Sequence, residues 1–170
     1  MTSELRRIKA FGFDVDGVLT NGFTGPGDTK TFHIHDGLGL KLLTLADIAV
    51  VVITGRSVAA ARERFQGLPI AFYGHVGEKI APAEEFLAAR GLSLEEFAFM
   101  GDDLPDVPLM KKAGFSFAPA DASSEARSAA RQVCRLPGGR GAVREAIEFL
   151  LRSQHRWKKV LRAYYDSLRS

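Results

Sequence analysis

The sequence predicts a single α/β domain built on a doubly wound parallel sheet, and three observations support this prediction. Short apolar runs alternate with amphipathic helical segments along most of the chain. One of these runs, Ile48–Ile53, is unbroken, as is typical of a strand covered on both faces, and the run Ile8–Phe13 is also typical of a buried parallel strand. Polar residues follow three of the strands directly: Asp14, Thr54 and Asp102. Because right-handed crossovers bring the carboxyl ends of parallel strands to one edge, these residues should meet there.

The composition is that of one soluble globular domain. At 170 residues the chain is long enough to bury a proper core, and its 46% hydrophobic and 25% charged fractions are ordinary. No apolar run approaches the roughly 20 residues that a membrane span needs. The polar N-terminus has no signal-peptide core, and the single Cys134 excludes an internal disulfide. We therefore expect a cytoplasmic protein.

The first strand ends in Asp14-Val15-Asp16-Gly17. On extended backbone the two aspartates would point to the same side, because they alternate with Val15. Two carboxylates on the same side of a strand repel each other, and this repulsion favours binding of a divalent cation or a proton on one of them. A carboxylate held by Mg²⁺ is a plausible nucleophile toward phosphorus. Two such acids are more often a solvated strand end, so the rest of the chain must decide.

Residues 21–35, called the flap segment below, predict a β-hairpin beside these acids. Gly22, Gly25 and the run Pro26-Gly27-Asp28 form a dense turn signal. The expected arms are Phe23 and Thr24 on one side and Thr31, Phe32 and Ile34 on the other. The exposed aromatic residues could meet another subunit or pack on the parent domain. Asp36 is then expected to cap a helix that runs to about Ala46.

The second strand, Ile48–Ile53, ends in Thr54-Gly55-Arg56. A hydroxyl, backbone N–H groups and a guanidinium at a strand's carboxyl end suit a phosphate. Alone this triplet is a weak signal, because Thr-Gly turns are common. A helix over Val58–Phe65 should follow.

A third strand, Ile70–Tyr73, precedes Lys79, which opens a helix expected to reach about Arg90. A fourth strand, Phe97–Met100, ends in a run that contains three carboxylates within five residues: Asp102, Asp103 and Asp106. Oxygen ligands of this kind select hard cations, Mg²⁺ above all. The remaining runs predict a fifth strand at Phe115–Ala118 and a possible edge strand at Gln132–Leu136.

With these motifs in order, the chain resembles the haloacid dehalogenase-like phosphatase superfamily. Within it, Asp14–Gly22, Phe32–Gly39 and Gly138–Glu145 are similar to the 3-deoxy-D-manno-octulosonate 8-phosphate phosphatase family. The resemblance covers about residues 8–151. It implies a phosphatase domain over 1–151 with no cap domain, because neither insertion point holds enough residues, followed by a separate segment, 152–170.

The resemblance also implies roles for individual residues. Asp14 would be the nucleophile and form an aspartyl-phosphate, and Asp16 would serve as general acid and then general base. Mg²⁺ would be held by the Asp14 side chain, the Asp16 carbonyl and Asp102. Thr54 and Gly55 would bind the phosphoryl oxygens together with Lys79, while Asp103 and Asp106 would support Lys79 and the metal's waters.

The implied substrate is a small sugar-acid phosphate used in making lipopolysaccharide precursors. Arg56 suits the carboxylate of such a sugar, and the related nonulosonate group often has glutamate there, so arginine favours the octulosonate. Arg140, in the Gly138–Gly141 loop, is a candidate for the same anionic substrate. The alternatives are a nine-carbon sialic-acid-like phosphate, promiscuous hydrolysis of small phosphates, or a non-catalytic binding subunit that has kept the fold.

Family members of this type are tetramers, so we expect a homotetramer with the flap segment and the C-terminal segment at the interface. Residues 152–170 carry six lysines or arginines against one acid, with apolar residues at helical spacing. We expect a basic amphipathic helix that packs its stripe on this domain or on a sister subunit. Contact with an anionic membrane or a nucleic acid is the alternative, and neither is expected.

Overall fold

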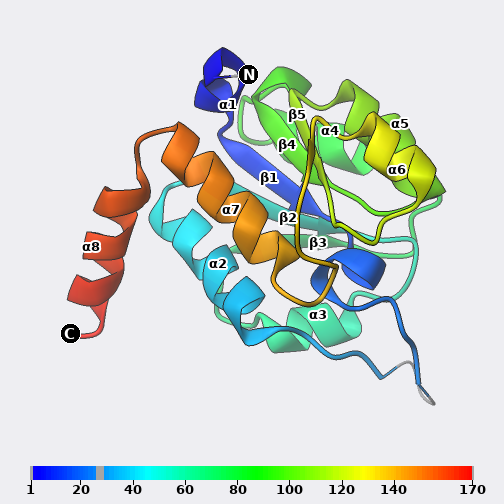
Figure 1. Ribbon diagram of the computed structural model, residues 1–170, viewed down its shortest axis with the longest axis horizontal. Coiled ribbons are helices and arrows are strands. Elements are labelled where there is room, and N and C mark those ends of the chain that lie inside the picture. Colours follow the sequence, from blue (N-terminus) through cyan, green and yellow to red (C-terminus); the bar gives the residue numbers. More distant parts are fainter. Residues whose placement is uncertain (1, 26–28, 170) are drawn as a thin grey trace.

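The computed structural model describes residues 2–25 and 29–169. Its centre is a six-stranded, all-parallel sheet in the order β3-β2-β1-β4-β5-β6 (Figure 1). The strands are β1 Ala10–Phe13, β2 Ala49–Ile53, β3 Ile70–Tyr73, β4 Phe97–Met100, β5 Phe115–Ala118 and β6 Gln132–Val133. Strand order reverses at β1, which lies between β2 and β4. The predicted doubly wound parallel sheet is therefore confirmed, and each predicted strand is present.

The register of the central strands explains where the polar motifs lie. Phe13 is the partner of Val52 on β2 and of Met100 on β4, so the three strands end at one level. The residues that follow them leave the sheet at the same edge. In open α/β sheets this carboxyl edge, at the point where strand order reverses, is where ligands bind.

Helices cover both faces of the sheet (Figure 1). The longer helices are α2 Ile34–Leu45, α4 Ile80–Ala88, α7 Ala142–Ser153 and α8 Trp157–Ser167, and the shorter ones are α1 Thr2–Arg7, α3 Ala59–Arg64, α5 Val107–Lys112 and α6 Ser124–Ala129. Alternate side chains of β1 and β2 divide between two cores. Phe11 and Phe13 share one core with α2 and α7, and Ala10 and Val51 share the other with α4 and α5. Burial of both faces accounts for the apolar runs.

The β-hairpin expected in the flap segment does not form in the described residues. Residues 21–25 and 29–33 contain no strand, and Ile34 belongs to α2. The predicted turn at 26–28 lies outside the described residues. An isolated two-stranded ribbon is only marginally stable in water, and here side-chain contacts hold the second arm instead. The Phe32 ring packs edge-on against Phe65, with 5.3 Å between ring centroids.

Asp36 caps a different helix from the one predicted. The helix begins at Ile34, with His33 as its N-cap residue, so Asp36 lies inside the first turn. Its buried carboxylate accepts hydrogen bonds from the backbone N–H groups of Gly141, at 3.1 Å, and Arg144, at 2.8 Å. These are otherwise unpaired donors at the start of α7. Asp36 thus joins α2 to α7 across more than 100 residues of sequence.

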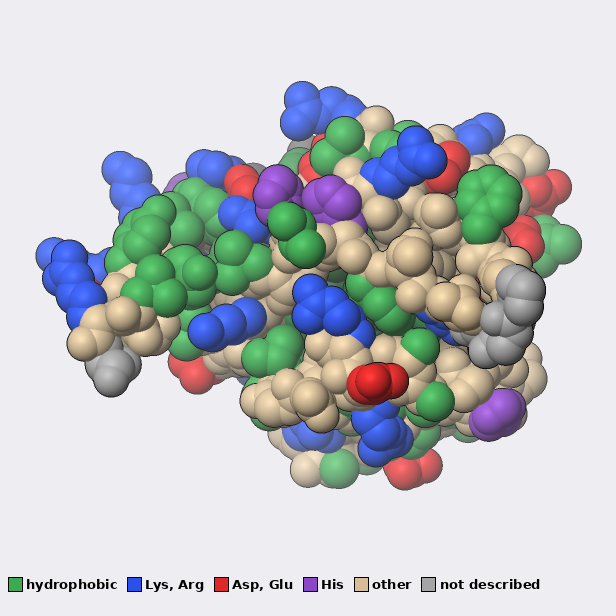
Figure 2. All heavy atoms as spheres, turned by 90° about the horizontal axis from the view of Figure 1, so that it is seen from below, with side chains coloured by type: hydrophobic (Ala, Val, Ile, Leu, Met, Phe, Trp, Pro, Cys, Tyr) green, Lys and Arg blue, Asp and Glu red, His purple; other side chains and the backbone are tan. Residues whose placement is uncertain are grey.

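The C-terminal segment forms α8, which packs against α2 and α7 through one stripe. Val160 is buried in the core, and Trp157 and Tyr164 pack against it. Tyr165 and Leu168 remain exposed, by 55% and 62%. Figure 2 shows hydrophobic side chains gathered at the end of the molecule that carries α8, with Lys and Arg side chains on their rim. Among the described residues, no helix has both the length and the apolar character needed to cross a bilayer.

Candidate active site

The predicted site residues meet, with one exception, around a cavity of about 360 Å³ at the carboxyl edge of the sheet. These residues come from the ends of β1, β2 and β4 and from the start of α4. The lining includes Asp14, Asp16, Thr54, Gly55, Arg56, Lys79, Asp102, Asp103 and Asp106. Only Arg140 lies outside this group. Sequence segments as far apart as Asp14 and Asp106 are therefore brought together by the parallel topology.

The backbone turns sharply after β1, within the helical turn η1 Val15–Leu19, because Gly17 adopts a φ of +84°. A Cβ atom on Gly17 would lie 1.9 Å from Asp102 Oδ2, so this position accepts no side chain. The loop Gly138–Gly141 packs closely against the same turn, since a Cβ on Gly138 would lie 1.7 Å from the Gly17 carbonyl oxygen. The glycines of both loops therefore allow close packing at the site.

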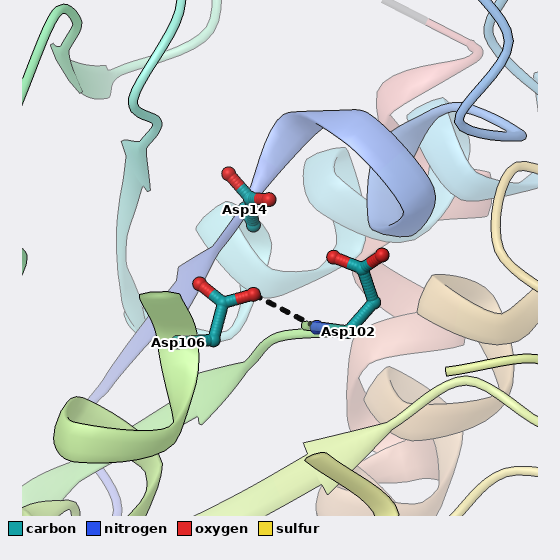
Figure 3. A group of neighbouring side chains, drawn as sticks. All are labelled: Asp14, Asp102 and Asp106. Carbon is teal, nitrogen blue, oxygen red and sulfur yellow. Dashed lines mark hydrogen bonds between the residues drawn. The ribbon is translucent and has the colours of Figure 1, made fainter. Parts of the chain in front are cut away.

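Three carboxylates converge on the cavity from β1 and from the segment after β4: Asp14, Asp102 and Asp106 (Figure 3). One oxygen of each lies within 4.8 Å of the others, close enough to share a metal ion. Burial and the charge of Asp106 raise the pKa of Asp14 to about 6. Burial, together with the charges of Asp14, Asp106 and Asp103, raises the pKa of Asp102 to about 8. This excess of buried negative charge is relieved by a divalent cation.

The acceptor atoms at the site also fit a cation. Asp16 Oδ2 is buried and accepts no hydrogen bond from the described residues, and Asp14 Oδ1, which is also buried, is paired with the Lys79 ammonium. Asp106 differs, because both of its oxygens are engaged. Its Oδ1 accepts from Lys79 Nζ at 2.6 Å, and its Oδ2 accepts from the Asp102 N–H at 2.9 Å (Figure 3). Asp14 and Asp102 are thus better placed to ligate a metal, while Asp106 holds the lysine and the loop.

Lys79, at the start of α4, is buried between two of these acids. Its Nζ lies 2.9 Å from Asp14 Oδ1 and 2.6 Å from Asp106 Oδ1. Burial lowers the pKa of Lys79, but the two carboxylates more than offset this effect, so the pKa is raised and the ammonium stays charged. Thr54 is also buried, and its Oγ1 accepts a hydrogen bond from the Arg56 N–H at 3.2 Å. The cavity therefore presents a cation and a hydroxyl beside Asp14.

Sequence reasoning missed Lys30, which comes from the flap segment. Its Nζ lies 2.5 Å from Asp16 Oδ1, and its side chain is only 1% exposed. The Arg56 Nε lies 3.8 Å from the other oxygen, Asp16 Oδ2. A lone lysine after a glycine-rich turn has no distinctive spacing. The only available signal was that the flap segment was expected beside the acids.

Arg140, predicted to bind substrate, does not line the cavity that contains Asp14. Its exposed side chain lines a separate cavity of about 550 Å³ along α7, together with His33 and Arg144. The reason is the conformation of the loop. Gly139, which adopts a positive φ, faces the backbone of Thr20 and Asn21 so closely that a Cβ would lie 2.3 Å away. The glycines, and not the arginine, therefore face the turn after β1.

The fold and this aspartate-rich edge agree with comparisons to known proteins. Residues 75–147 match the haloacid dehalogenase-like hydrolase family. This match identifies the class of the segment that contains Lys79 and the acids after β4 as haloacid dehalogenase-like. The chain is also 38% identical over 160 residues to the 3-deoxy-D-manno-octulosonate 8-phosphate phosphatase KdsC of Haemophilus influenzae, covering 91% of this chain and 88% of that protein. The chain belongs to this phosphatase family.

Solved structures give the same result. The 3-deoxy-D-manno-octulosonate 8-phosphate phosphatase of Moraxella catarrhalis, in complex with magnesium, phosphate and the sugar acid KDO, is 31% identical with a TM-score of 0.88. The match covers 96% of this chain and 97% of that one. The cobalt-bound phosphatase of Haemophilus influenzae is 38% identical with a TM-score of 0.84, covering 89% of this chain and 92% of that one.

Proposed function

We propose that this phosphatase hydrolyses 3-deoxy-D-manno-octulosonate 8-phosphate to the free sugar acid and phosphate, with Mg²⁺ as cofactor. One observation carries the proposal: a single cavity is lined by the buried Asp14 carboxylate, by an Asp16 oxygen that accepts no hydrogen bond from the described residues, by a buried ammonium and by a hydroxyl. These are the groups that phosphoryl transfer to an aspartate requires. The relatives named for this reaction support the choice of substrate.

In the first half-reaction, a carboxylate oxygen of Asp14 attacks the phosphorus atom and the bond from phosphorus to the sugar oxygen breaks. Asp16, two residues further on, gives its proton to that leaving oxygen. Lys79 and the Thr54 hydroxyl donate to the phosphoryl oxygens and stabilise the charge that builds up on them. The Lys79 ammonium lies close to Asp14, where the charge develops.

In the second half-reaction, Asp16 accepts a proton from water, and the resulting hydroxide oxygen attacks the phosphorus of the aspartyl-phosphate. The bond to Asp14 breaks, and phosphate and the Asp14 carboxylate are released. One carboxyl group thus donates a proton and then recovers one, so that the cycle closes.

We propose that Asp14, Asp102 and the Asp16 carbonyl hold the Mg²⁺, which would neutralise phosphate charge when bound. Asp106 holds Lys79 and the Asp102 backbone in place by its hydrogen bonds. Asp103, which is exposed at the rim of the cavity, would support the metal's waters. Arg56 lines the cavity with half of its side chain exposed, which suits the carboxylate of a sugar acid.

Phosphate release should distinguish this substrate from the alternatives. We expect kcat/KM for the octulosonate 8-phosphate to exceed that for a nine-carbon sugar-acid phosphate by roughly 10-fold or more. Activity should vanish on chelation and return with Mg²⁺. Equal rates on both sugars and on simple phosphates would instead indicate a promiscuous phosphatase. No release from any of them would contradict the proposed function and favour a binding subunit.

The proposal also includes a homotetramer. Large apolar side chains are exposed on the flap segment, with Phe23 at 75% and Ile34 at 70%, and on α8. Phe23 follows Gly22, which lines the cavity, so burying the flap segment against a sister subunit would also enclose the site. We expect light scattering coupled to size exclusion to give about four times the chain mass of 18.5 kDa. A monomeric mass across the micromolar range would rule the tetramer out.

A further inference from the structure

The flap segment contributes a buried ammonium to the proposed active site. The Lys30 side chain is 1% exposed, and its Nζ donates to Asp16 Oδ1 at 2.5 Å. Burying a charge is costly unless it is paired and hydrogen-bonded, so this contact is a strong local constraint. Two residues further on, the packing of Phe32 on Phe65 holds the segment against the domain.

The two oxygens of Asp16 are in different environments. Oδ1 is held by Lys30. Oδ2 is buried and accepts no hydrogen bond within the described part of the chain, and the Arg56 Nε lies 3.8 Å from it. That distance is too long for a hydrogen bond. One oxygen is therefore anchored while the other is left for a ligand in the cavity.

We propose that Lys30 is a positioning residue for Asp16. By holding Oδ1, it selects the rotamer that points Oδ2 at the leaving oxygen of the substrate. This inference rests on the proposed function of Asp16 as general acid. A carboxyl group that rotates freely spends little time in reach of the leaving oxygen, and small losses of alignment reduce proton transfer steeply.

This role predicts a dependence on the leaving group. A sugar alkoxide is a poor leaving group and needs a proton as the bond to phosphorus breaks. A p-nitrophenolate leaves without one. The ratio kcat/KM reports the steps up to departure of the leaving group. A defect in proton donation should therefore lower kcat/KM for the sugar phosphate alone. A defect in phosphate binding or nucleophilic attack should lower it for both esters.

The test compares Lys30→Met and Lys30→Arg in the full chain, with the exposed Lys112→Met at the end of α5 as the matched control. For Lys30→Met we expect kcat/KM on the octulosonate 8-phosphate to fall by about 100-fold, the lower end of what general acid catalysis contributes. On p-nitrophenyl phosphate it should stay within about 3-fold of wild type. Lys30→Arg should recover most of the loss, because it keeps a charged donor. Lys112→Met should change neither value.

A double-mutant cycle completes the test. If Lys30 acts through Asp16, Lys30→Met should have no further effect in an Asp16→Asn background. A parallel loss on both esters, an unchanged sugar-phosphate rate, or additive losses in the cycle would overturn the proposal. Thermal unfolding of each variant shows whether a parallel loss reflects lost fold. Should the wild type hydrolyse a different alkyl phosphate, the proposed substrate is wrong, and the same comparison on that ester still decides the role of Lys30.

Discussion

Replacing Asp14 by asparagine is expected to reduce phosphatase turnover by roughly 10⁴-fold or more, the scale on which removing a nucleophile acts. The amide has almost the same shape as the carboxylate, so the fold should persist. It is a poor nucleophile and a neutral neighbour for Lys79, whose Nζ lies 2.9 Å from Asp14 Oδ1. The cavity would keep its shape and lose the atom that we propose attacks phosphorus.

Two measurements check this expectation. The first is phosphate release under saturating Mg²⁺, with the exposed Asp47→Asn, between α2 and β2, as a matched control that should retain full activity. The second is acid quenching of the enzyme during turnover, followed by peptide mass analysis. Phosphate should be found on the peptide that contains Asp14 in the wild type and on none in the variant. Activity that survives in Asp14→Asn, or a phosphorylated residue elsewhere, would show that another group is the nucleophile.

Replacing Asp102 by asparagine should abolish Mg²⁺-dependent activity and, at the same time, stabilise the metal-free protein at high pH. The pKa of Asp102 is raised to about 8, first by burial and then by the charges of Asp14, Asp106 and Asp103. In the unfolded chain an aspartate has a pKa of about 3.9. The folded state therefore holds a proton more tightly, and stability is lost progressively as the pH rises from the unfolded pKa of about 3.9 to the folded pKa of about 8. Asparagine carries no such charge.

The comparison is made by thermal unfolding in chelator at pH 5.5 and at pH 9. The two proteins should have similar Tm values at pH 5.5, where the Asp102 carboxyl is neutral. At pH 9 the variant should be higher by roughly 7–14 °C, because the roughly 2.5 pH units between pH 5.5 and the folded pKa of about 8 amount to about 3.4 kcal/mol and each kcal/mol corresponds to about 2–4 °C for a chain of this size. Added Mg²⁺ should raise the Tm of the wild type most at pH 9 and leave that of Asp102→Asn almost unchanged. Equal shifts of both proteins with Mg²⁺ would contradict a role for Asp102 as a ligand.

Much of the site could be predicted because its residues follow strands directly. Asp14, Thr54 and Asp102 each come after a buried apolar run, and parallel pairing of β2, β1 and β4 brings such positions to one edge whatever the loops do. Strand positions were predictable for the same reason, since strands buried on both faces leave an unbroken apolar signal. Lys79 follows β3 by only a short turn, which limits where it can lie.

Other features depend on contacts that local sequence does not encode. Asp36 has the composition of a cap for its own helix, yet its carboxylate serves the N-terminus of α7, because packing brings the two helix starts together. The flap segment contains residues typical of a hairpin, but the described residues have no strand pairing there. Arg140 lines another cavity, because the glycines of its loop face the turn after β1.

The sequence by itself therefore determined the sheet, the edge at which chemistry can occur and the acids, hydroxyl and lysine gathered there. These follow from periodicity and from the end of each strand, which are local properties of the chain. Only the tertiary structure decided which acid holds Lys79, where Arg140 lies and that Lys30 reaches Asp16. Lys30 and Asp16 are 14 positions apart, and Lys79 and Asp106 are 27 positions apart. The geometry of such contacts is set by packing between elements, which a local sequence pattern does not encode.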